Sequence, residues 1–361
     1  MIKNTILKGN ISIIAGLLFC LTATAQESQL KLVFAGDIMG HDTQIASALA
    51  TGEPGYDYKP CFQYLRPYLQ EADLVIGNLE VTFAGLPYKG YPAFSSPDEL
   101  AAALKWAGFD ILINANNHAL DRGQKGLLRT LEVLDQEELV QTGTFPDPES
   151  RIAFYPLVVE KNGIRIALLN YTYGTNGIKD RPPSIINRIN KDQIREDMKK
   201  AHTAKPDFIL VTMHWGKEYQ LTESSHQQDL ASYLFELGAD AVIGSHPHVV
   251  QPIQGEGVGN LVVYSLGNLI SNQRTRPRDG GIIFEMVLLK EAHEITSHAY
   301  LPVWVWKPVS KKGTRFTLVP ANLDPASDIL SDMSLTDRNK MTVFLEDTRS
   351  RLLGREEVKS P

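Results

Sequence analysis

Five short polar clusters, each placed directly after a run of apolar residues, constrain the fold of this chain more than any other feature. The clusters are Gly36–His41, Gly77–Glu80, Asn116–Asp121, His214–Tyr219 and Gly244–His248. Helical patterns separate several of the apolar runs, and this alternation is typical of a covered α/β sheet. Because ligands bind outside the carboxyl ends of strands in such sheets, we expect all five clusters to meet at one edge.

The residue types in these clusters favour a metal site. Carboxylates, amide oxygens and imidazoles are ligands of Mn²⁺, Fe²⁺ and Zn²⁺, and five of the nine histidines lie in the clusters. His246 and His248 are two residues apart, so in an extended segment both would point into one cavity. Each residue has an ordinary alternative. Asp37 or Asn117 alone is more often a cap or turn residue, and His214 alone could be a structural histidine.

The apolar runs also predict the order of the elements. Strands are expected at 30–35, 73–76, 109–113, 164–169, 208–212, 241–243 and 261–264. Two later runs, at 282–289 and 300–306, have no helix between them and are expected to form a second sheet or half of a sandwich. Ser96 and Ser224 each begin a capping-box pattern and therefore predict helix starts. A last helix is expected over residues 336–352.

The first 25 residues read as a secretory signal peptide. Lys3 and Lys8 precede an apolar stretch at 11–21, which is short for a membrane span, and Ala23–Ala25 is a small-residue cleavage signature. An uncleaved N-terminal anchor is the alternative. The segment carries two lysines and no acidic residue, so its removal changes the formal charge from −6 to −8. It also removes one of two cysteines, and Cys61 alone cannot form an internal disulfide.

The rest of the sequence predicts neither a membrane-spanning segment nor binding to nucleic acid. No later run is long and apolar enough to predict a stable transmembrane segment after signal cleavage. The acidic net charge does not point to nucleic acid, whose binding favours clustered lysines and arginines and a positive surface. We therefore expect an exported protein of the periplasm, the cell envelope or the extracellular space.

In these clusters the sequence resembles the CapA family, the capsule or poly-γ-glutamate biosynthesis proteins with a metallophosphatase-like domain. The resemblance covers residues 30–285 and runs through six motifs in order, namely Gly36–Met39, Gly77–Glu80, Asn116–Gly123, His214–Tyr219, Gly244–Val249 and Tyr264–Asn268. It implies an α/β fold, the four-layer α/β/β/α sandwich of calcineurin-like metallophosphoesterases. That domain would span residues 26–310, and residues 311–361 would form a C-terminal extension with a terminal helix.

The same resemblance implies roles for individual residues. His118 would protonate the leaving group, and Glu80 would stand where a bridging aspartate usually lies. One ion would be bound by Glu80, Asn117, His214 and His246. The other would be bound by Asp37, Glu80 and His248, with His41 as a further candidate ligand.

One position departs from the family pattern. The phosphoesterase motif has a histidine two residues after the first aspartate, whereas this chain has Met39 there and its histidine is His41. A thioether is a poor ligand for these ions. We therefore expect one divalent ion, or two of unequal affinity, with Mn, Fe or Zn as the metal.

Two functions from different classes follow. The first is a metal-dependent hydrolase, in which a metal-bound hydroxide attacks a phosphoester or a γ-glutamyl-type polymer and His118 acts as general acid. The second is a non-catalytic envelope factor that binds or assembles polymer, which the Met39 departure favours. A third alternative, a small-molecule receptor, rests on loop tyrosines such as Tyr171 and Tyr173. Fold alone does not decide between them.

The candidate substrate-binding residues are His41, Glu218 and Arg274. Arg274 belongs to a segment with two further arginines, and such segments are more often solvated loops. The expected substrate is an extracellular or periplasmic polymer or phosphoester. The sequence does not fix the oligomeric state.

Overall fold

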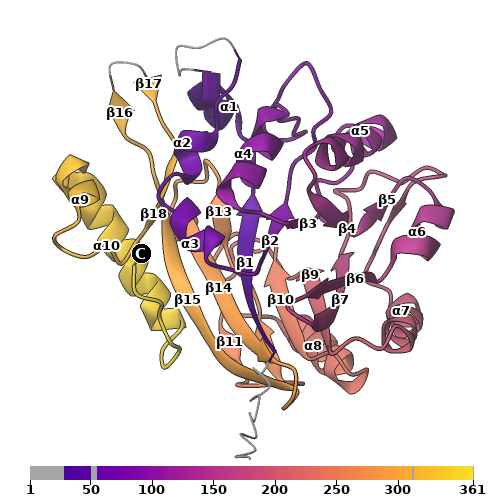
Figure 1. Ribbon diagram of the computed structural model, residues 1–361. Helices are drawn as coiled ribbons and strands as arrows, with labels where there is room; N and C mark the ends of the chain where they lie inside the picture. The colour runs from indigo at the N-terminus through magenta and orange to yellow at the C-terminus, as the bar shows by residue number, and fades with distance from the viewer. Residues whose placement is uncertain (1–27, 50–54, 311–312, 361) are drawn as a thin grey trace, which may run out of the picture.

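Two β-sheets packed face to face, with helices on both outer faces, make up the protein (Figure 1). The computed structural model describes residues 28–49, 55–310 and 313–360, so the predicted signal peptide with Cys20 lies outside the described residues. This layering confirms the predicted α/β/β/α sandwich of the metallophosphoesterase type. No helix in the described ranges combines the length and the apolar character needed to cross a membrane.

The larger sheet combines parallel and antiparallel strands. Its order is β18-β15-β14-β1-β2-β3-β4, and β13 pairs with the end of β1. The strands are β1 (Gln29–Ile38), β2 (Leu74–Leu79), β3 (Ile111–Ile113), β4 (Val140–Thr142), β13 (Asn268–Ile270), β14 (Gly280–Leu289), β15 (Glu294–Trp306) and β18 (Thr317–Pro320). Of the two alternatives for the runs at 282–289 and 300–306, a separate second sheet is wrong, because both runs lie in the larger sheet, which is one half of the sandwich. They extend the first sheet, because β14 pairs antiparallel with β1 and β15 follows β14 through a hairpin, which needs no crossover helix.

The smaller sheet has the order β11-β12-β10-β9-β7-β6. Its strands are β6 (Leu157–Lys161), β7 (Ile164–Thr172), β9 (Phe208–His214), β10 (Ala241–Ser245), β11 (Ile253–Gln254) and β12 (Leu261–Val263). Four of them, β7, β9, β10 and β12, run parallel to one another. Two short ladders lie outside both sheets, β5 (Thr144–Phe145) with β8 (Ile185–Ile186) and β16 (Val309–Ser310) with β17 (Gly313–Thr314).

The central strand β1 is buried on both faces. Val33 and Ala35 pack toward the helices, whereas Leu32 and Phe34 pack between the two sheets. This alternation is the two-residue period of a strand, and because both faces are apolar the sequence shows one continuous apolar run.

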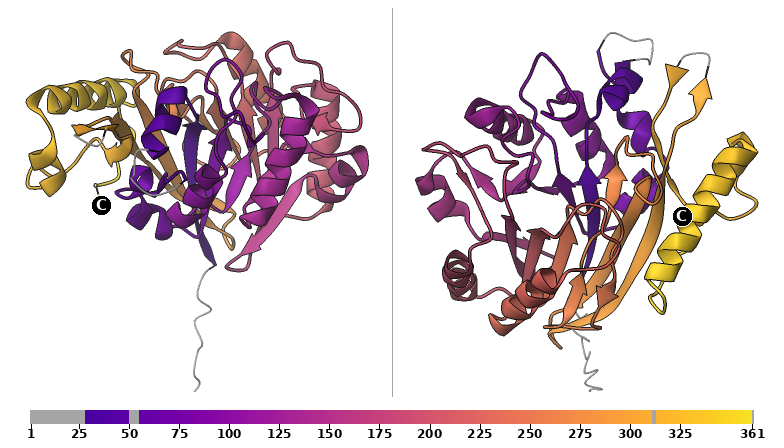
Figure 2. Two further views of the ribbon diagram at one scale, coloured as in Figure 1. Left: turned by 90° about the horizontal axis from the view of Figure 1, so that it is seen from above. Right: turned by 180° about the vertical axis from the view of Figure 1, so that it is seen from behind.

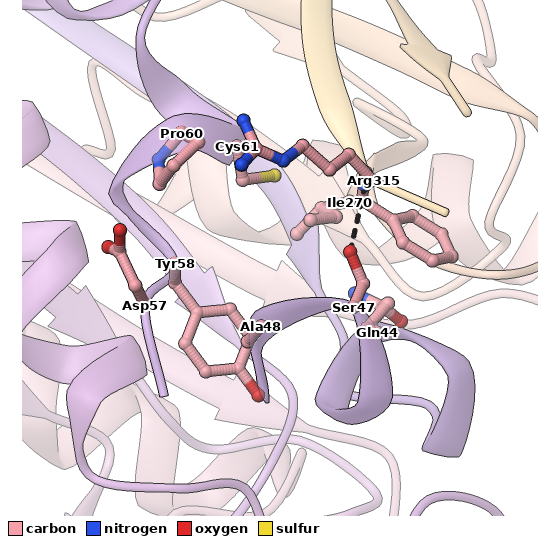
Figure 3. Close-up of a pocket in the computed structure, with 10 residues that line it drawn as sticks. Gln44, Ser47, Ala48, Asp57, Tyr58, Pro60, Cys61, Ile270 and Arg315 are labelled. Carbon is pink, nitrogen blue, oxygen red and sulfur yellow. Dashed lines mark hydrogen bonds between the residues drawn. The ribbon is translucent and has the colours of Figure 1, made fainter. Parts of the chain in front are cut away.

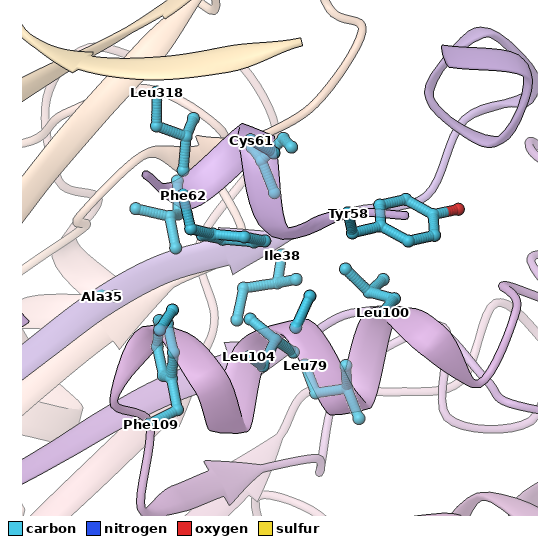
Figure 4. Close-up of a cluster of buried hydrophobic side chains, with 14 of the residues drawn as sticks. Ala35, Ile38, Tyr58, Cys61, Phe62, Leu79, Leu100, Leu104, Phe109 and Leu318 are labelled. Atoms are coloured by element: carbon cyan, nitrogen blue, oxygen red, sulfur yellow. The ribbon is translucent and has the colours of Figure 1, made fainter. Parts of the chain in front are cut away.

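Helices cover the two outer faces (Figure 2). On the larger sheet lie α1 (Asp42–Leu49), α2 (Lys59–Phe62), α3 (Arg66–Gln70), α4 (Glu99–Ala107) and α5 (Gly123–Gln136). Figure 4 shows Leu100 and Leu104 of α4 facing Ile38 and Leu79 at the ends of β1 and β2. On the smaller sheet α7 (Lys191–Thr203) and α8 (Ser225–Glu236) pack against the strands, and α6 (Pro148–Phe154) contacts β5.

The two predicted capping boxes behave differently. Ser224 caps α8 with both bonds of the box to Gln227, as predicted. Ser96 does not cap α4, which begins at Glu99, so that prediction is wrong. Ser96 is instead buried against Gly40, where a Cβ atom on the glycine would lie 2.0 Å from the serine hydroxyl oxygen. Tertiary packing therefore overrides the local helix-start signal at this position.

The last segment of the chain is built into the larger sheet. β18 pairs with β15, and α10 (Leu335–Arg351), which follows α9 (Asp328–Asp332), matches the predicted terminal helix. Met341 and Phe344 of α10 pack on Trp304 and Trp306 of β15. These tryptophans lie on the same face of β15 as Tyr300 of the inter-sheet core, but α10 rather than the smaller sheet packs on them.

Replacing Phe344 with alanine is expected to destabilise the whole protein. Phe344 is 2 % exposed, and truncating a buried phenylalanine typically costs about 3–5 kcal/mol. Urea unfolding at equilibrium measures the loss, with Lys340→Ala on the exposed side of the same helix as the matched control. A loss below about 1 kcal/mol for Phe344→Ala would mean that α10 is not part of the cooperative core.

Candidate metal centre

The strand ends bring seven of the predicted residues into one buried cluster. Asp37 lies in β1, Glu80 follows β2, and the Asn117–His118 pair follows β3. His214 ends β9, and His246 and His248 follow β10. All seven side chains are buried. The clusters therefore come from the edges of two facing sheets, and the expectation of one sheet edge is corrected in this respect.

Two groups of possible metal ligands share Glu80. The ligand atoms of Glu80, His246 and His248 lie within 4.8 Å of one another, as do those of Asp37, Glu80 and His214. Glu80 Oε1 is 3.6 Å from His214 Nε2 and 3.8 Å from His248 Nε2. Asn117 Oδ1 lies 2.7 Å from His214 Nε2 and so belongs to the same cluster. Glu80 is therefore the carboxylate that both groups have in common.

Unpaired atoms at the centre of the cluster fit a bound cation. Among the residues that the structure describes, neither carboxylate oxygen of Glu80 has a hydrogen-bond partner, and neither does His246 Nδ1. A buried carboxylate without a partner is costly, and a coordinated ion removes that cost. The donor set of carboxylate, amide oxygen and imidazole suits a divalent transition metal. The residues present therefore indicate a divalent metal site.

The electrostatics of the cluster also suit a cation. Burial, with the neighbouring Asp37 carboxylate, raises the pKa of Glu80 well above its usual range. Burial beside other histidines holds the pKa of His214 well below its usual range and lowers the pKa of His246 to about 3. Both imidazoles are therefore neutral near pH 7, which is the form that binds metal ions.

The turn that carries the two paired histidines is not extended. His246 has φ +99° and His248 has φ +58°, both in the left-handed region that non-glycine residues rarely adopt. The prediction that an extended segment aligns the two rings is therefore wrong in its geometry, since β10 ends at Ser245. Both rings nevertheless reach Glu80. Strained residues of this kind cluster at functional sites.

His118 lies beside the ligand groups and is held by an acidic partner. Its Nδ1 is 2.7 Å from Asp121 Oδ2, and the same oxygen accepts a hydrogen bond of 2.8 Å from the Phe94 backbone N–H. The Phe94 ring packs edge-on against the imidazole, with 4.7 Å between ring centroids. Asp121 thus fixes the orientation of His118, with Nδ1–H as the donor and Nε2 left for other chemistry.

Two polar residues that support the cluster were not predicted as site residues. Asn78 Nδ2 donates to Asp37 Oδ1 at 2.7 Å and lies 3.3 Å from His214 Nδ1. Ser245 Oγ lies 3.4 Å from the same nitrogen. Partners of this kind orient metal ligands. Strand pairing places Asn78 directly opposite Asp37. Asn78 also lies two residues before Glu80, and side chains at this spacing in a strand share a face, so the sequence could have indicated that Asn78 points toward the site.

The three predicted substrate-binding residues have different surroundings. The half-buried Glu218 lies close enough for its charge to raise the pKa of Glu80 further. His41 is also half-buried, with Nδ1 3.0 Å from Gln44 Oε1, and it belongs to neither ligand group. Arg274 lies over the Trp304 ring at 5.6 Å, toward α10. The structure therefore does not bring Arg274 to the cluster.

The aromatic residues near the cluster differ in exposure. Tyr171 is not a loop residue, because it lies in β7, fully buried, with its hydroxyl bonded to Asp197. Tyr173 is 47 % exposed, and its ring centroid lies 4.5 Å from that of His246. Tyr173 is therefore the tyrosine of this pair that forms part of the entrance to the cluster.

A separate small cavity lies beneath α1, lined by residues that include Ser47, Tyr58 and Cys61 (Figure 3). Its volume is about 20 Å³, which holds a water molecule but no organic ligand. Cys61 is buried there without a disulfide partner among the described residues. This cavity is therefore not a substrate site.

Comparisons with known proteins agree with this geometry. The family described as "Bacterial capsule synthesis protein PGA_cap" matches residues 31–273. The capsule biosynthesis protein CapA of Bacillus anthracis is 32 % identical over 277 residues, which cover 72 % of this chain and 64 % of that protein. The PGA biosynthesis protein CapA of Bacillus subtilis (strain 168) is 31 % identical over 283 residues, covering 72 % and 68 %. The chain thus spans about two thirds of the length of these curated relatives.

Among solved structures, the NAD nucleotidase of Haemophilus influenzae aligns with a TM-score of 0.50 at 14 % sequence identity. The alignment covers 93 % of this chain and 66 % of that one. This likeness shows a shared fold alone.

Proposed function

Because the chain belongs to the bacterial capsule synthesis protein family PGA_cap, the CapA family, we propose that it is an exported, metal-dependent hydrolase of capsule biosynthesis. Its substrate would be a phosphoester or a γ-glutamyl-type polymer of the periplasm or cell exterior. The observation that carries the proposal is the Glu80 carboxylate, which is buried between neutral histidines and has no hydrogen-bond partner in the described part of the chain. The proposal of export rests on the N-terminal sequence alone.

The residues that would hold the metal are Asp37, Glu80, Asn117, His214, His246 and His248. A divalent ion bound there supplies Lewis-acid polarisation and makes water a better nucleophile at neutral pH. Asn78 holds Asp37 in position through its amide. His118, oriented by Asp121, is the group that protonates the leaving group.

Alanine at His118 separates acid catalysis from metal binding. We expect turnover to fall by about 10²–10⁴-fold while the metal content stays the same, because His118 belongs to neither ligand group. Metal content is measured by mass spectrometry on the mature protein. Turnover is measured with bis(4-nitrophenyl) phosphate and with γ-glutamyl anilides.

Asp121→Asn is the matched second variant, because it keeps the imidazole but weakens its orientation. It should lower turnover less than His118→Ala does. Equal turnover in the wild type and His118→Ala would exclude the acid role. A wild-type protein that takes up no metal from Mn²⁺ or Zn²⁺ solutions would exclude the hydrolase.

One observation favours the non-catalytic alternative, a polymer-binding or assembly factor. Met39 packs in the apolar core at 2 % exposure, so the position two residues after Asp37 supplies no ligand. Exported polymer can be measured in cells that carry Asp37→Ala and in cells that lack the whole protein. Normal polymer in the variant and none in the deletion strain would favour the assembly factor.

A further inference from the structure

We propose that Arg278, stacked on Tyr219 beside the metal centre, binds a second anionic group of the substrate, a carboxylate or a phosphate, and so selects polyanionic substrates. The inference rests on the proposed function, because it concerns the substrate of the same site. It adds the substrate's charge class and the residue that recognises it.

The position of the arginine places a cation at the entrance to the cluster. The Arg278 guanidinium carbon lies 4.2 Å from the centroid of the Tyr219 ring, and that ring lies 6.1 Å from the His248 ring. Tyr219 is 42 % exposed, so this stack faces solvent as well as the metal ligands. A guanidinium placed over an aromatic ring can still offer N–H groups to an anion.

Arg278 also differs from its neighbour in the same segment. Arg276 forms two hydrogen bonds to Asp347, at 2.5 and 2.6 Å, and its charge is thereby neutralised. Within the described ranges of the chain, no carboxylate oxygen lies within 4.0 Å of the Arg278 guanidinium. The charge of Arg278 is therefore available to a ligand.

Buried contacts fix both members of the stack to the metal-binding turn. The side-chain amide of Asn268, the first residue of β13, donates to the backbone oxygens of Arg278 at 2.9 Å and of His248 at 3.4 Å. The Tyr219 N–H donates to the Pro247 oxygen at 2.8 Å. Tyr219 has φ +67°, a left-handed conformation that costs a tyrosine free energy. The fold thus holds this pair in place at a cost, which is typical of a binding site.

The charges around the cluster explain why such a cation is needed. The side chains of Asp37, Glu80 and Glu218 are acidic, and the chain as a whole carries a formal charge of −6. These carboxylates repel an anionic substrate that approaches them. One or two bound metal ions would offset this repulsion only at the metal centre itself. Arg278 supplies positive charge away from the ions, where a neighbouring substituent of the substrate would lie.

The test compares ligands that differ only in a second anion, using the metal-loaded mature protein and calorimetry. The carboxylate arm uses γ-linked triglutamate and its α-carboxamide analogue. The phosphate arm uses propane-1,3-diol bisphosphate and propanol monophosphate. Arg278→Gln should weaken binding of the more anionic member by about 10–100-fold in at least one arm, the range for a lost charge-assisted hydrogen bond. The less anionic member should change by less than twofold.

Arg276→Gln is the matched control and should leave all four affinities unchanged within twofold. The arm that responds to Arg278→Gln identifies whether the anion is a carboxylate or a phosphate. The proposal is overturned if Arg278→Gln leaves the ratio of the two affinities unchanged in both arms. The experiment measures binding and not turnover. The role of Arg278 can therefore be confirmed or excluded whether or not the hydrolase activity is found.

Discussion

Alanine at His246 is expected to remove the metal and the activity together. His246 joins Glu80 and His248 in one ligand group, and its buried Nδ1 has no hydrogen-bond partner within the described ranges. Loss of a direct ligand should weaken metal affinity by at least about 100-fold, the upper range for loss of a group that only supports a ligand. After dialysis, mass spectrometry should find about one or two equivalents of metal in the wild type and almost none in the variant. Turnover should fall in the same proportion.

His226→Ala is the matched control for this experiment, because His226 is an exposed histidine on α8. Its metal content and turnover should equal those of the wild type. Full turnover in a His246→Ala protein shown to be metal-free would falsify the metal-dependent hydrolase. Full metal content in that variant would remove His246 from the ligand set.

Glutamine at Glu80 is expected to stabilise the metal-free protein while abolishing its response to metal. Burial and Asp37 raise the pKa of Glu80, so ionisation of this carboxyl opposes folding at any pH above its unfolded value of about 4.3. Removing the ionisable group should therefore raise the free energy of unfolding at pH 7.5 by about 1–3 kcal/mol, because the neutral amide avoids the cost of ionising a buried group beside Asp37. With metal at 100 times its Kd, the wild type should instead gain about 2.7 kcal/mol, and the variant should gain nothing.

The sign of this effect can be checked with pH. The penalty on the wild type is absent below the unfolded pKa and grows as the pH rises toward the raised folded pKa, so the two metal-free proteins should converge in stability near pH 4. Glu132→Gln, a change at an exposed carboxyl on α5, should show neither effect. A metal-free Glu80→Gln protein that is less stable than the wild type at pH 7.5 would show that Glu80 is not destabilising in the fold.

The site could be predicted further from the sequence than the sheets could. Polar residues that directly follow apolar strands can be recognised in the sequence as candidate site residues. Three of them, Asp37, Glu80 and His214, do lie together in the structure. The division of the strands between two sheets was not predictable in this way. The pairing of β1 with β14 joins residues far apart in the chain, and nothing local to either strand specifies it.

Residues whose role depends on a distant partner were the ones missed. Asp121 stood in a recognised motif, but only its 2.7 Å contact identifies it as the partner of His118. Of three arginines in one segment, Arg274 was the predicted substrate residue, whereas Arg278 lies beside the cluster. The conformation of that segment determines which arginine reaches the cluster. This conformation depends on a hydrogen bond from Asn268, which lies outside the segment.

The central position of β1 sets the order in which the protein can fold during synthesis. Leu30 pairs with Leu288, so the first strand to emerge must wait for a partner that is made 258 residues later. At typical synthesis rates of about 5–20 residues per second, this delay is roughly 10–50 s. Until then the larger sheet lacks the strand on one side of β1. A chain that we propose to be exported therefore stays without its native core for nearly the whole of its translation, which leaves time for the unfolded chain to be secreted.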